Sequence, residues 1–238
     1  DTPREIRIFP CKRANTMRLD KPNMRLVIFG GGGMIGRPII EEALRRNHEV
    51  IAVDPFPDRI PIKNPNLTII QTDVYSVDRV SELVRKADAV IVSHNPAFEQ
   101  PDLFDSVLKL YPFILEGVKE AGVPRILFVG EAGTLYVEPG IMLMDTGAIS
   151  GDEASGIRML GGFYLDVLKH EHDIDWVYFS PAVDIVPAPL TGSYRLGEND
   201  LIVNPDGFSL ISSGDYASAL MDEIDAPVHH NERFTIGY

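Results

Sequence analysis

Residues 24–38 read MRLVIFGGGGMIGRP, and this stretch decides the fold. The apolar run 25–29 predicts a buried strand, and the glycines after it lead into the apolar periodicity of a helix at 35–46. Glycine in such a turn permits a positive φ and lets the backbone approach a diphosphate closely. The N-terminus of the following helix offers free N–H groups to the same anion. The spacing is GxxGxxG, and the expected contacts are the backbones of Gly30, Gly33, Met34, Ile35 and Gly36.

An acidic residue follows the second apolar run, where a dinucleotide site needs one. Asp54 comes directly after residues 49–53. Its carboxylate is expected to accept hydrogen bonds from the adenosine ribose, and its charge repels a 2′-phosphate, which favours NADH over NADPH. Arg37 and Arg59 could each reach a 2′-phosphate, so NADPH stays open as the alternative cofactor. In the alternative interpretation, Asp54 merely begins the turn before Pro55.

Apolar periodicity alternates between short β-rich runs and longer helical stretches along the chain. This order is typical of βαβ units, so we predict an α/β fold: an open, doubly wound parallel Rossmann sheet with its ligand crevice at the carboxyl ends of the strands. Residues after 179 form shorter pieces that are expected to build a small substrate-side region. The expected strands are 25–29, 49–53, 67–71, 89–92, 125–129 and 175–179, followed by 193–196, 201–203 and 233–236; the expected helices are 35–46, 77–85, 103–121, 153–170 and 214–224.

Composition excludes several classes of protein. The 238 residues carry 22 Lys and Arg against 35 Asp and Glu, a net charge of −13, which argues against a nucleic-acid partner. A single cysteine, Cys11, excludes an internal disulfide and fits the cytoplasm. No apolar run approaches the roughly 18 residues of a membrane span. Residues 1–23 are expected to be a disordered or non-native leader, or alternatively a partner-binding arm, before a single domain at 24–238.

Motifs after the later expected strands add to the glycine turn. They are Gln71-Thr72-Asp73-Val74, residues 87–93, residues 128–134 (FVGEAGT), Ser180-Pro181-Ala182, and residues 192–197 and 233–238. With these motifs, residues 24–238 resemble the atypical short-chain dehydrogenase/reductases, in particular the NAD(P)H-binding, NmrA-like group and its NADH-flavin reductase-like branch. The resemblance implies that Asp73 bonds the adenine amino group, that Val74 packs on the adenine ring, and that Ser93, His94 and Asn95 line the central riboses.

The proton-transfer pair of ordinary family members is missing. They carry a tyrosine with a lysine four residues later on one helix, and the lysine lowers the pKa of the tyrosine. Tyr164 has Leu168 at that offset, and Lys169 comes one position later, about 140° around an α-helix. Thr134 lies where the family often has a serine. Thr134 and Tyr164 are the candidate catalytic residues, and Tyr136, Phe163, Tyr164 and Tyr194 are candidates to stack on a flat acceptor, each with a place in the core as the alternative.

These observations lead to two main hypotheses. The first is an NAD(P)H-dependent oxidoreductase that passes hydride to FMN, FAD or a similar flat small-molecule acceptor, since a flavin needs no protein acid. The second is a catalytically silent NAD(P)-binding sensor. A nucleotide-sugar epimerase is a weaker third hypothesis because it needs the Tyr/Lys pair. No metal site is expected, since His170, His172, His229 and His230 lack ligand spacing and read as solvated surface. The protein is expected to be a monomer or homodimer.

Overall fold

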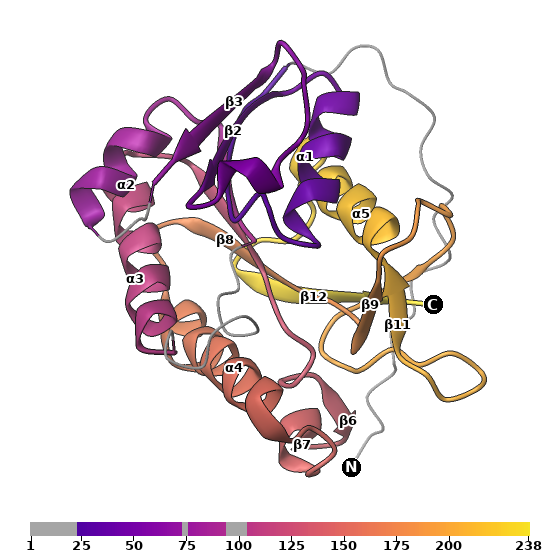
Figure 1. The fold of residues 1–238 in the computed structure, drawn as a ribbon. Coiled ribbons are helices and arrows are strands. Elements are labelled where there is room, and N and C mark those ends of the chain that lie inside the picture. Colours follow the sequence, from indigo (N-terminus) through magenta and orange to yellow (C-terminus); the bar gives the residue numbers. More distant parts are fainter. Residues whose placement is uncertain (1–22, 73–75, 94–103) are drawn as a thin grey trace.

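The computed structural model describes residues 23–72, 76–93 and 104–238 (Figure 1). Within these ranges, no helix combines the length and the apolar character that crossing a membrane requires. Four predicted cofactor contacts lie outside the described residues, as does nearly all of the expected leader. These contacts are Asp73, Val74, His94 and Asn95.

One eight-stranded sheet organises the chain, in the order β10-β12-β8-β5-β4-β1-β2-β3. All neighbouring strands run parallel except β10, which pairs antiparallel with β12 at the edge. The predicted doubly wound parallel sheet is therefore confirmed. The strands of this sheet are β1 (Arg25–Phe29), β2 (Glu49–Asp54), β3 (Leu67–Gln71), β4 (Ala89–Val92), β5 (Arg125–Val129), β8 (Asp175–Ser180), β10 (Arg195–Gly197) and β12 (Glu232–Gly237).

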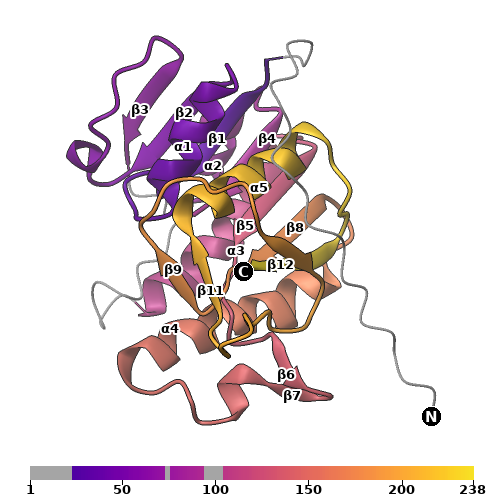
Figure 2. The ribbon, with the colours of Figure 1, turned by 90° about the vertical axis from the view of Figure 1, so that its right-hand side faces the viewer.

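Helices cover both faces of the sheet (Figures 1 and 2). One face packs against α1 (Gly36–Arg45) and α5 (Ser213–Asp225), and the other against α2 (Val77–Val84), α3 (Phe104–Glu120) and α4 (Gly151–Gly162). The side chains of each strand alternate between the two apolar layers, as the pleat requires: Tyr178 of β8 lies in the α4 layer and Phe179 in the α5 layer.

The strand order reverses beside β1, and this reversal places the site. The chain leaves β1 toward β2 and β3, then returns to β4 on the opposite side of β1. Loops that leave the carboxyl ends of β1 and β4 therefore diverge to opposite faces and open a crevice between them. Gly30 follows β1 and Ser93 follows β4 at this crevice.

The helix predicted at 153–170 is interrupted, which corrects the prediction. It is α-helical to Gly162, continues as a π-helical turn, η5 (Phe163–Val167), and ends in the 3-10 turn η6 (Leu168–His170). A π turn admits one extra residue per turn, and the apolar periodicity of the sequence does not show where that happens.

Short strands in the long connections were not predicted. They are β6 (Tyr136–Glu138) with β7 (Ile141–Met142), and β9 (Asp184–Val186) with β11 (Leu210–Ser212). The expected strand 201–203 is not a strand; this segment lies beside β6, where the Leu201 N–H donates to the Tyr136 carbonyl (2.8 Å). The connections also contain η1 (Pro57–Arg59) and η4 (Leu143–Asp145).

Candidate dinucleotide and acceptor site

The glycine turn has the geometry that its sequence predicts. Gly30 has a φ of 79°, and its carbonyl accepts a hydrogen bond from the Gly33 N–H (3.3 Å). A Cβ on Gly36 would lie 2.1 Å from the Gly30 oxygen, so no side chain fits there. Gly33 differs, because a Cβ there would meet only the Gly30 oxygen at 3.5 Å, an ordinary contact. The fold therefore requires glycine at positions 30 and 36 and leaves position 33 open.

Helix α1 begins without a side-chain cap. Its N-cap, Ile35, makes no capping hydrogen bond, and the Arg37 N–H donates to the Gly33 carbonyl (3.1 Å) while the Ile39 N–H donates to the Ile35 carbonyl (3.2 Å). Among the described residues, none accepts from the backbone N–H groups of Met34, Ile35 or Gly36. Met34 is 46% exposed, so these donors lie at an accessible helix N-terminus, where the helix dipole favours an anion.

Asp54 ends β2 beside this turn and is buried. Its Oδ2 accepts from the Gly32 N–H (2.8 Å) and its Oδ1 from the Phe56 N–H (2.8 Å). The second bond is the turn contact of the alternative interpretation. The first fixes the carboxylate against the glycine turn, and each oxygen keeps another lone pair for a ribose hydroxyl. The turn contact and a bond to a ribose hydroxyl are therefore compatible with each other in the geometry of Asp54.

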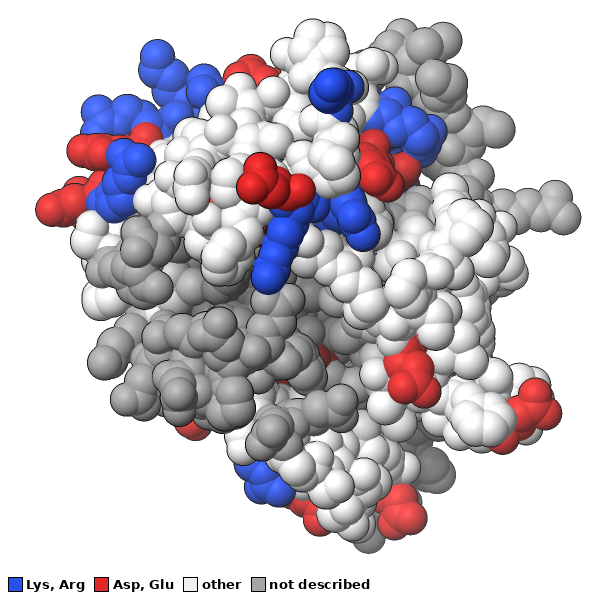
Figure 3. Space-filling model, viewed as in Figure 1, with Lys and Arg blue, Asp and Glu red and all other residues white. Residues whose placement is uncertain are grey.

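Two exposed arginines occur close in sequence to the glycine turn and to Asp54. Arg37 and Arg59 are both exposed, and the Arg59 guanidinium lies 4.5 Å from the centre of the Phe56 ring. On the face drawn in Figure 3, basic and acidic side chains lie next to one another, without a continuous field of either sign. Arg59 lies near Asp54, since a Cβ on Gly32 would meet both the Arg59 Cβ (2.8 Å) and the Asp54 Oδ2 (3.0 Å).

Ser93 supplies the opposite wall of the crevice. Its N–H donates to the Phe29 carbonyl (2.8 Å), which joins the ends of β4 and β1. Its hydroxyl is buried and has no hydrogen-bond partner among the described residues. An unsatisfied buried hydroxyl is costly, so a polar ligand group here would be stabilising. The described candidates Gly30, Gly33, Met34, Ile35, Gly36, Asp54 and Ser93 thus gather at the carboxyl ends of β1, β2 and β4.

A second polar cluster lies beyond the end of β5. Glu131 is buried and accepts two bonds from Thr134, one from its N–H (3.0 Å) and one from its hydroxyl (2.6 Å). Burial raises the pKa of Glu131, although the two Thr134 bonds and the Arg233 charge act in the opposite direction. Arg233 donates to the Thr134 hydroxyl (2.8 Å) and carbonyl (2.9 Å). Thr134 therefore links the Glu131 carboxyl group to the Arg233 guanidinium through hydrogen bonds.

This geometry gives Thr134 a positioning role. The residue is 0% exposed, its hydroxyl proton is donated to Glu131, and its oxygen accepts from Arg233. A catalytic contact with an acceptor, one of the sequence expectations, would need an accessible hydroxyl. Thr134 instead holds the loop after β5 to the last strand of the sheet.

Tyr164 belongs to the π turn η5 and lies beside this cluster. Its ring stacks on Tyr178 at 4.6 Å between centres, and the Arg233 guanidinium lies 4.8 Å from its centre. Burial raises the pKa of Tyr164, and the Arg233 charge opposes the rise. Tyr164, Phe163 and Tyr194 are each at most 6% exposed, so their rings do not offer a free face to a flat acceptor. Tyr136 is half-buried.

Sequence reasoning missed Glu131 and Arg233 as members of one cluster. Both occur in quoted motifs, but they are 102 positions apart, and nothing in the local pattern pairs them. The prediction that His229 is solvated surface is wrong. His229 stacks on Phe234 at 4.1 Å, and its Nδ1 bonds Glu223 (2.7 Å). Within the described ranges, no group of three or more His, Cys, Asp or Glu side chains could hold a metal.

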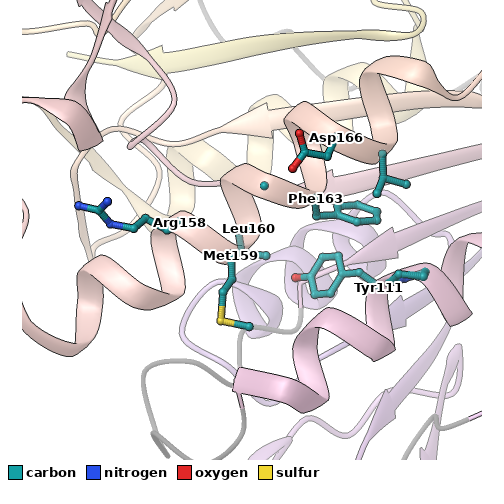
Figure 4. A pocket seen from close by; sticks show the side chains of 9 residues that line it. Tyr111, Arg158, Met159, Leu160, Phe163 and Asp166 are labelled. Carbon is teal, nitrogen blue, oxygen red and sulfur yellow. The ribbon is translucent and has the colours of Figure 1, made fainter.

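A separate pocket of about 340 Å³ lies between α3 and the α4–η5 segment (Figure 4). Its walls are mainly apolar, and Figure 4 shows Tyr111, Met159 and Phe163 between the two helical segments, with Arg158 and Asp166 farther out. The pocket is apart from the glycine turn, and none of its lining residues is a predicted cofactor contact.

A family described as NAD(P)H-binding matches residues 30–227, from the glycine turn to the end of α5. The chain belongs to this NAD(P)H-binding family. The uncharacterized protein YwnB of Bacillus subtilis is 34% identical over 216 residues, 90% of this chain and 98% of YwnB. The matched range includes both the glycine turn and Asp54.

Two solved structures resemble this NAD(P)H-binding protein over nearly their whole length. A "putative epimerase" from Bacteroides thetaiotaomicron is 46% identical with a TM-score of 0.86, covering 91% of this chain and 98% of that one. A "putative NADH-flavin reductase" from Streptococcus pneumoniae is 28% identical with a TM-score of 0.73, covering 90% and 99%. The resemblance to the atypical short-chain dehydrogenase/reductases is thereby confirmed.

Proposed function

We propose that this protein is an NAD(P)H-dependent oxidoreductase that reduces a flavin, a quinone or a similarly flat acceptor, with a preference for NADH. The observation that carries the proposal is the uncapped N-terminus of α1 behind a glycine turn, with Asp54 fixed beside it. The similarity to a structure described as a "putative NADH-flavin reductase" supports the flat acceptor. When bound, the nicotinamide supplies the hydride, and the protein supplies binding and orientation.

Each described candidate has a defined part in cofactor binding. The N–H groups of Met34, Ile35 and Gly36 would hold the diphosphate, because they have no partner among the described residues. Asp54 would accept from the ribose hydroxyls with its remaining lone pairs. Ser93 would offer its unsatisfied hydroxyl near the central riboses. We extend the proposal to Asp73, Val74, His94 and Asn95 on the family resemblance alone.

The test is oxidation of NADH and of NADPH, followed by the loss of nicotinamide absorbance, with FMN, FAD and a quinone each in turn. We expect turnover with at least one acceptor and a larger kcat/KM for NADH than for NADPH. A protein that binds NADH but oxidises it with none of the three acceptors contradicts the reductase proposal. Faster turnover with NADPH contradicts the assigned role of Asp54.

A catalytically silent sensor is the second candidate. This candidate is supported by the burial of the expected catalytic groups. Thr134 is fully buried, and the buried Tyr164 ring packs against Tyr178 and the Arg233 guanidinium. Dinucleotide binding without turnover would favour it. The epimerase hypothesis takes support from the Bacteroides relative, but Tyr164 still lacks a lysine four residues later. The epimerase hypothesis is tested by assaying the same protein preparation for epimerisation of a nucleotide-sugar.

A further inference from the structure

The pocket between α3 and the α4–η5 segment lies where both helices depart from regular geometry (Figure 4). Pro112, in the interior of α3, has no N–H to donate, so one helical hydrogen bond is missing there. Across the pocket, the π turn η5 begins at Phe163. Both residues line the hollow. Since π turns are rare and occur frequently at functional sites, the hollow between these two irregularities is a candidate binding site.

The floor of this pocket is aromatic and anchored in the core. The Tyr111 and Phe163 rings pack edge to face, 5.2 Å between centres, and both contact Phe128 of β5, at 5.7 Å and 5.1 Å. Tyr111 is 1% exposed, and Leu160, which also lines the pocket, is 2% exposed. Because packing holds these side chains in place, the pocket is formed before a ligand arrives, as is usual for small-molecule sites.

Two neighbouring glycines in α4 differ in the space around them. A Cβ on Gly161 would lie 2.7 Å from the Thr134 Cγ2 atom, so packing requires glycine there. Apart from chain neighbours and the helix backbone, a Cβ on Gly162 would meet only the Asp166 Oδ2 atom, at 3.8 Å. Gly162 also has ordinary helical dihedral angles, φ −61° and ψ −45°. Neither packing nor strain therefore requires glycine, a poor helix former, at 162, and the missing side chain leaves the pocket open.

The surface around the pocket is not a broad apolar face. Among the side chains that the structure describes, one exposed large apolar residue belongs to α3, α4 or η5, and this is Val167. A stable contact between two proteins buries about 800 Å² on each partner and has an apolar centre. The apolar surface here instead lies inside a hollow of about 340 Å³. This distribution favours a small molecule over a second copy of the chain.

Opposite charges flank the pocket at its rim. Arg158 lies four residues before Gly162, and Asp166 lies four residues after it. Both side chains are exposed, and neither forms a hydrogen bond or an ion pair within the described part of the chain. Figure 4 shows them farther out than Tyr111 and Phe163. Because one positive and one negative group are offered, the rim favours a ligand without net charge.

We propose that this pocket is a second ligand site, apart from the glycine turn, which binds uncharged fused two-ring aromatic compounds of the size of indole. The size follows from the volume, because an apolar cavity of roughly 150 Å³ holds benzene and this pocket has about 340 Å³. The ring system packs against the aromatic floor and the Met159 thioether, which favours aromatic neighbours. The site does not depend on the proposed function, since none of its lining residues is a predicted cofactor contact.

The first test follows the methionine methyl groups by ¹³C NMR while indole is added to the wild-type protein. We expect the Met159 signal, assigned with Met159→Leu, to shift and saturate with a Kd below about 1 mM. Met34, at the glycine turn, is the internal reference and should not shift. NOEs from indole protons to the Phe163 ring would support the proposed floor. A Met159 signal that does not shift, or a Met34 signal that shifts with it, would overturn the proposal.

The second test fills the pocket. Gly162→Leu should raise the Kd of indole at least about tenfold, whereas the matched control Gly162→Ala, which adds one methyl group, should raise it less than about threefold. Urea denaturation checks that both variants fold, and if Gly162→Leu does not, the wild-type titration decides. Unchanged indole binding in folded Gly162→Leu would overturn the proposal. A wild-type dimer that Gly162→Leu dissociates in sedimentation would also overturn it, because a second copy would then occupy the pocket.

Discussion

Gly33 and Gly36 illustrate two different reasons for glycine in one turn. A Cβ at position 36 would collide with the Gly30 carbonyl, whereas one at position 33 meets that carbonyl at an ordinary distance. Gly33 is also exposed and does not have a positive φ. Since the fold does not require glycine at 33, we propose that glycine serves there to let a ligand approach the backbone.

This difference predicts the behaviour of two substitutions. Gly33→Val should leave the free energy of unfolding within about 0.5 kcal/mol of wild type, because it is a surface change, and weaken NADH binding by at least about tenfold. Gly36→Val should destabilise the protein, because the turn must open. Urea denaturation and calorimetric titration measure the two effects. Undiminished binding in a folded Gly33→Val protein would refute the assignment of the diphosphate to this turn.

Asp54 can be tested with little disturbance of the turn. Asp54→Asn removes the negative charge and keeps one carbonyl oxygen for the N–H groups of Gly32 or Phe56. We expect the Kd of NADH to rise and that of NADPH to fall or stay constant, since the repulsion of a 2′-phosphate is lost. The Kd values of both cofactors, measured side by side, check this. A rise of equal size for both would show that Asp54 acts only on the turn.

At the scale of elements, regular strands were predictable and the irregular helix was not. The strands β1, β4 and β5 have the bounds expected from sequence, because strands buried on both faces read as continuous apolar runs. The edge strand β3 also has its expected bounds, although it is only partly buried. Helix α4 becomes the π turn η5 at Phe163, where the apolar residues of 163–168 fit either an α-helix or a π-helix. The short pair β9 and β11 depends on a contact between distant segments, which a local pattern does not contain.

The contact between α2 and α3 is close enough to test. A Cβ on Gly117 of α3 would lie 2.5 Å from the Val80 Cβ of α2, so Gly117→Ala should push the helices apart. We expect destabilisation of about 1–3 kcal/mol, the usual cost of overpacking, despite the better helix propensity of alanine. Glu116→Ala, one position away on the exposed side, is the control. Equal unfolding free energies of the two variants in urea would contradict this packing.

At the scale of the whole molecule, the buried polar cluster around Thr134 is assembled from distant parts of the chain. Glu131 follows β5, Tyr164 follows α4, and Arg233 lies on β12, yet the sheet order brings β5, β8 and β12 together. Residues of the glycine turn were predictable because they are contiguous. The contact between Tyr164 and Arg233 was not predictable, since it joins a helix end to a strand far along the chain and depends on the tertiary fold.

The C-terminal strand is also fixed by a buried carboxylate, which makes stability depend on pH. Asp215 accepts from the hydroxyls of Tyr238 (2.6 Å), Thr191 (2.7 Å) and Ser212 (2.9 Å), and from the N–H groups of Gly192 (2.8 Å) and Thr191 (3.0 Å). Burial tends to raise its pKa, but these bonds together lower it below the ordinary 3.8. The stabilisation is therefore present above the unfolded pKa and lost as pH falls through the folded pKa.

We accordingly expect Asp215→Asn to destabilise the protein by roughly 1–3 kcal/mol at pH 7, because the charged acceptor is lost. The difference from wild type should shrink as the pH is lowered below the unfolded pKa, where the wild-type carboxyl becomes protonated. Urea denaturation of both proteins across acidic and neutral pH measures this. A difference that stays constant with pH would show that the Asp215 charge does not stabilise the fold.

Amide hydrogen exchange tests the central claim, that the start of α1 binds the diphosphate of NAD(P)H, most directly. Exchange is measured residue by residue by NMR, with and without saturating NADH. We predict that the N–H groups of Met34, Ile35 and Gly36 exchange rapidly in the free protein, since they have no partner among the described residues, and slowly in the complex. NADH binding that leaves these three amides in rapid exchange would contradict the account.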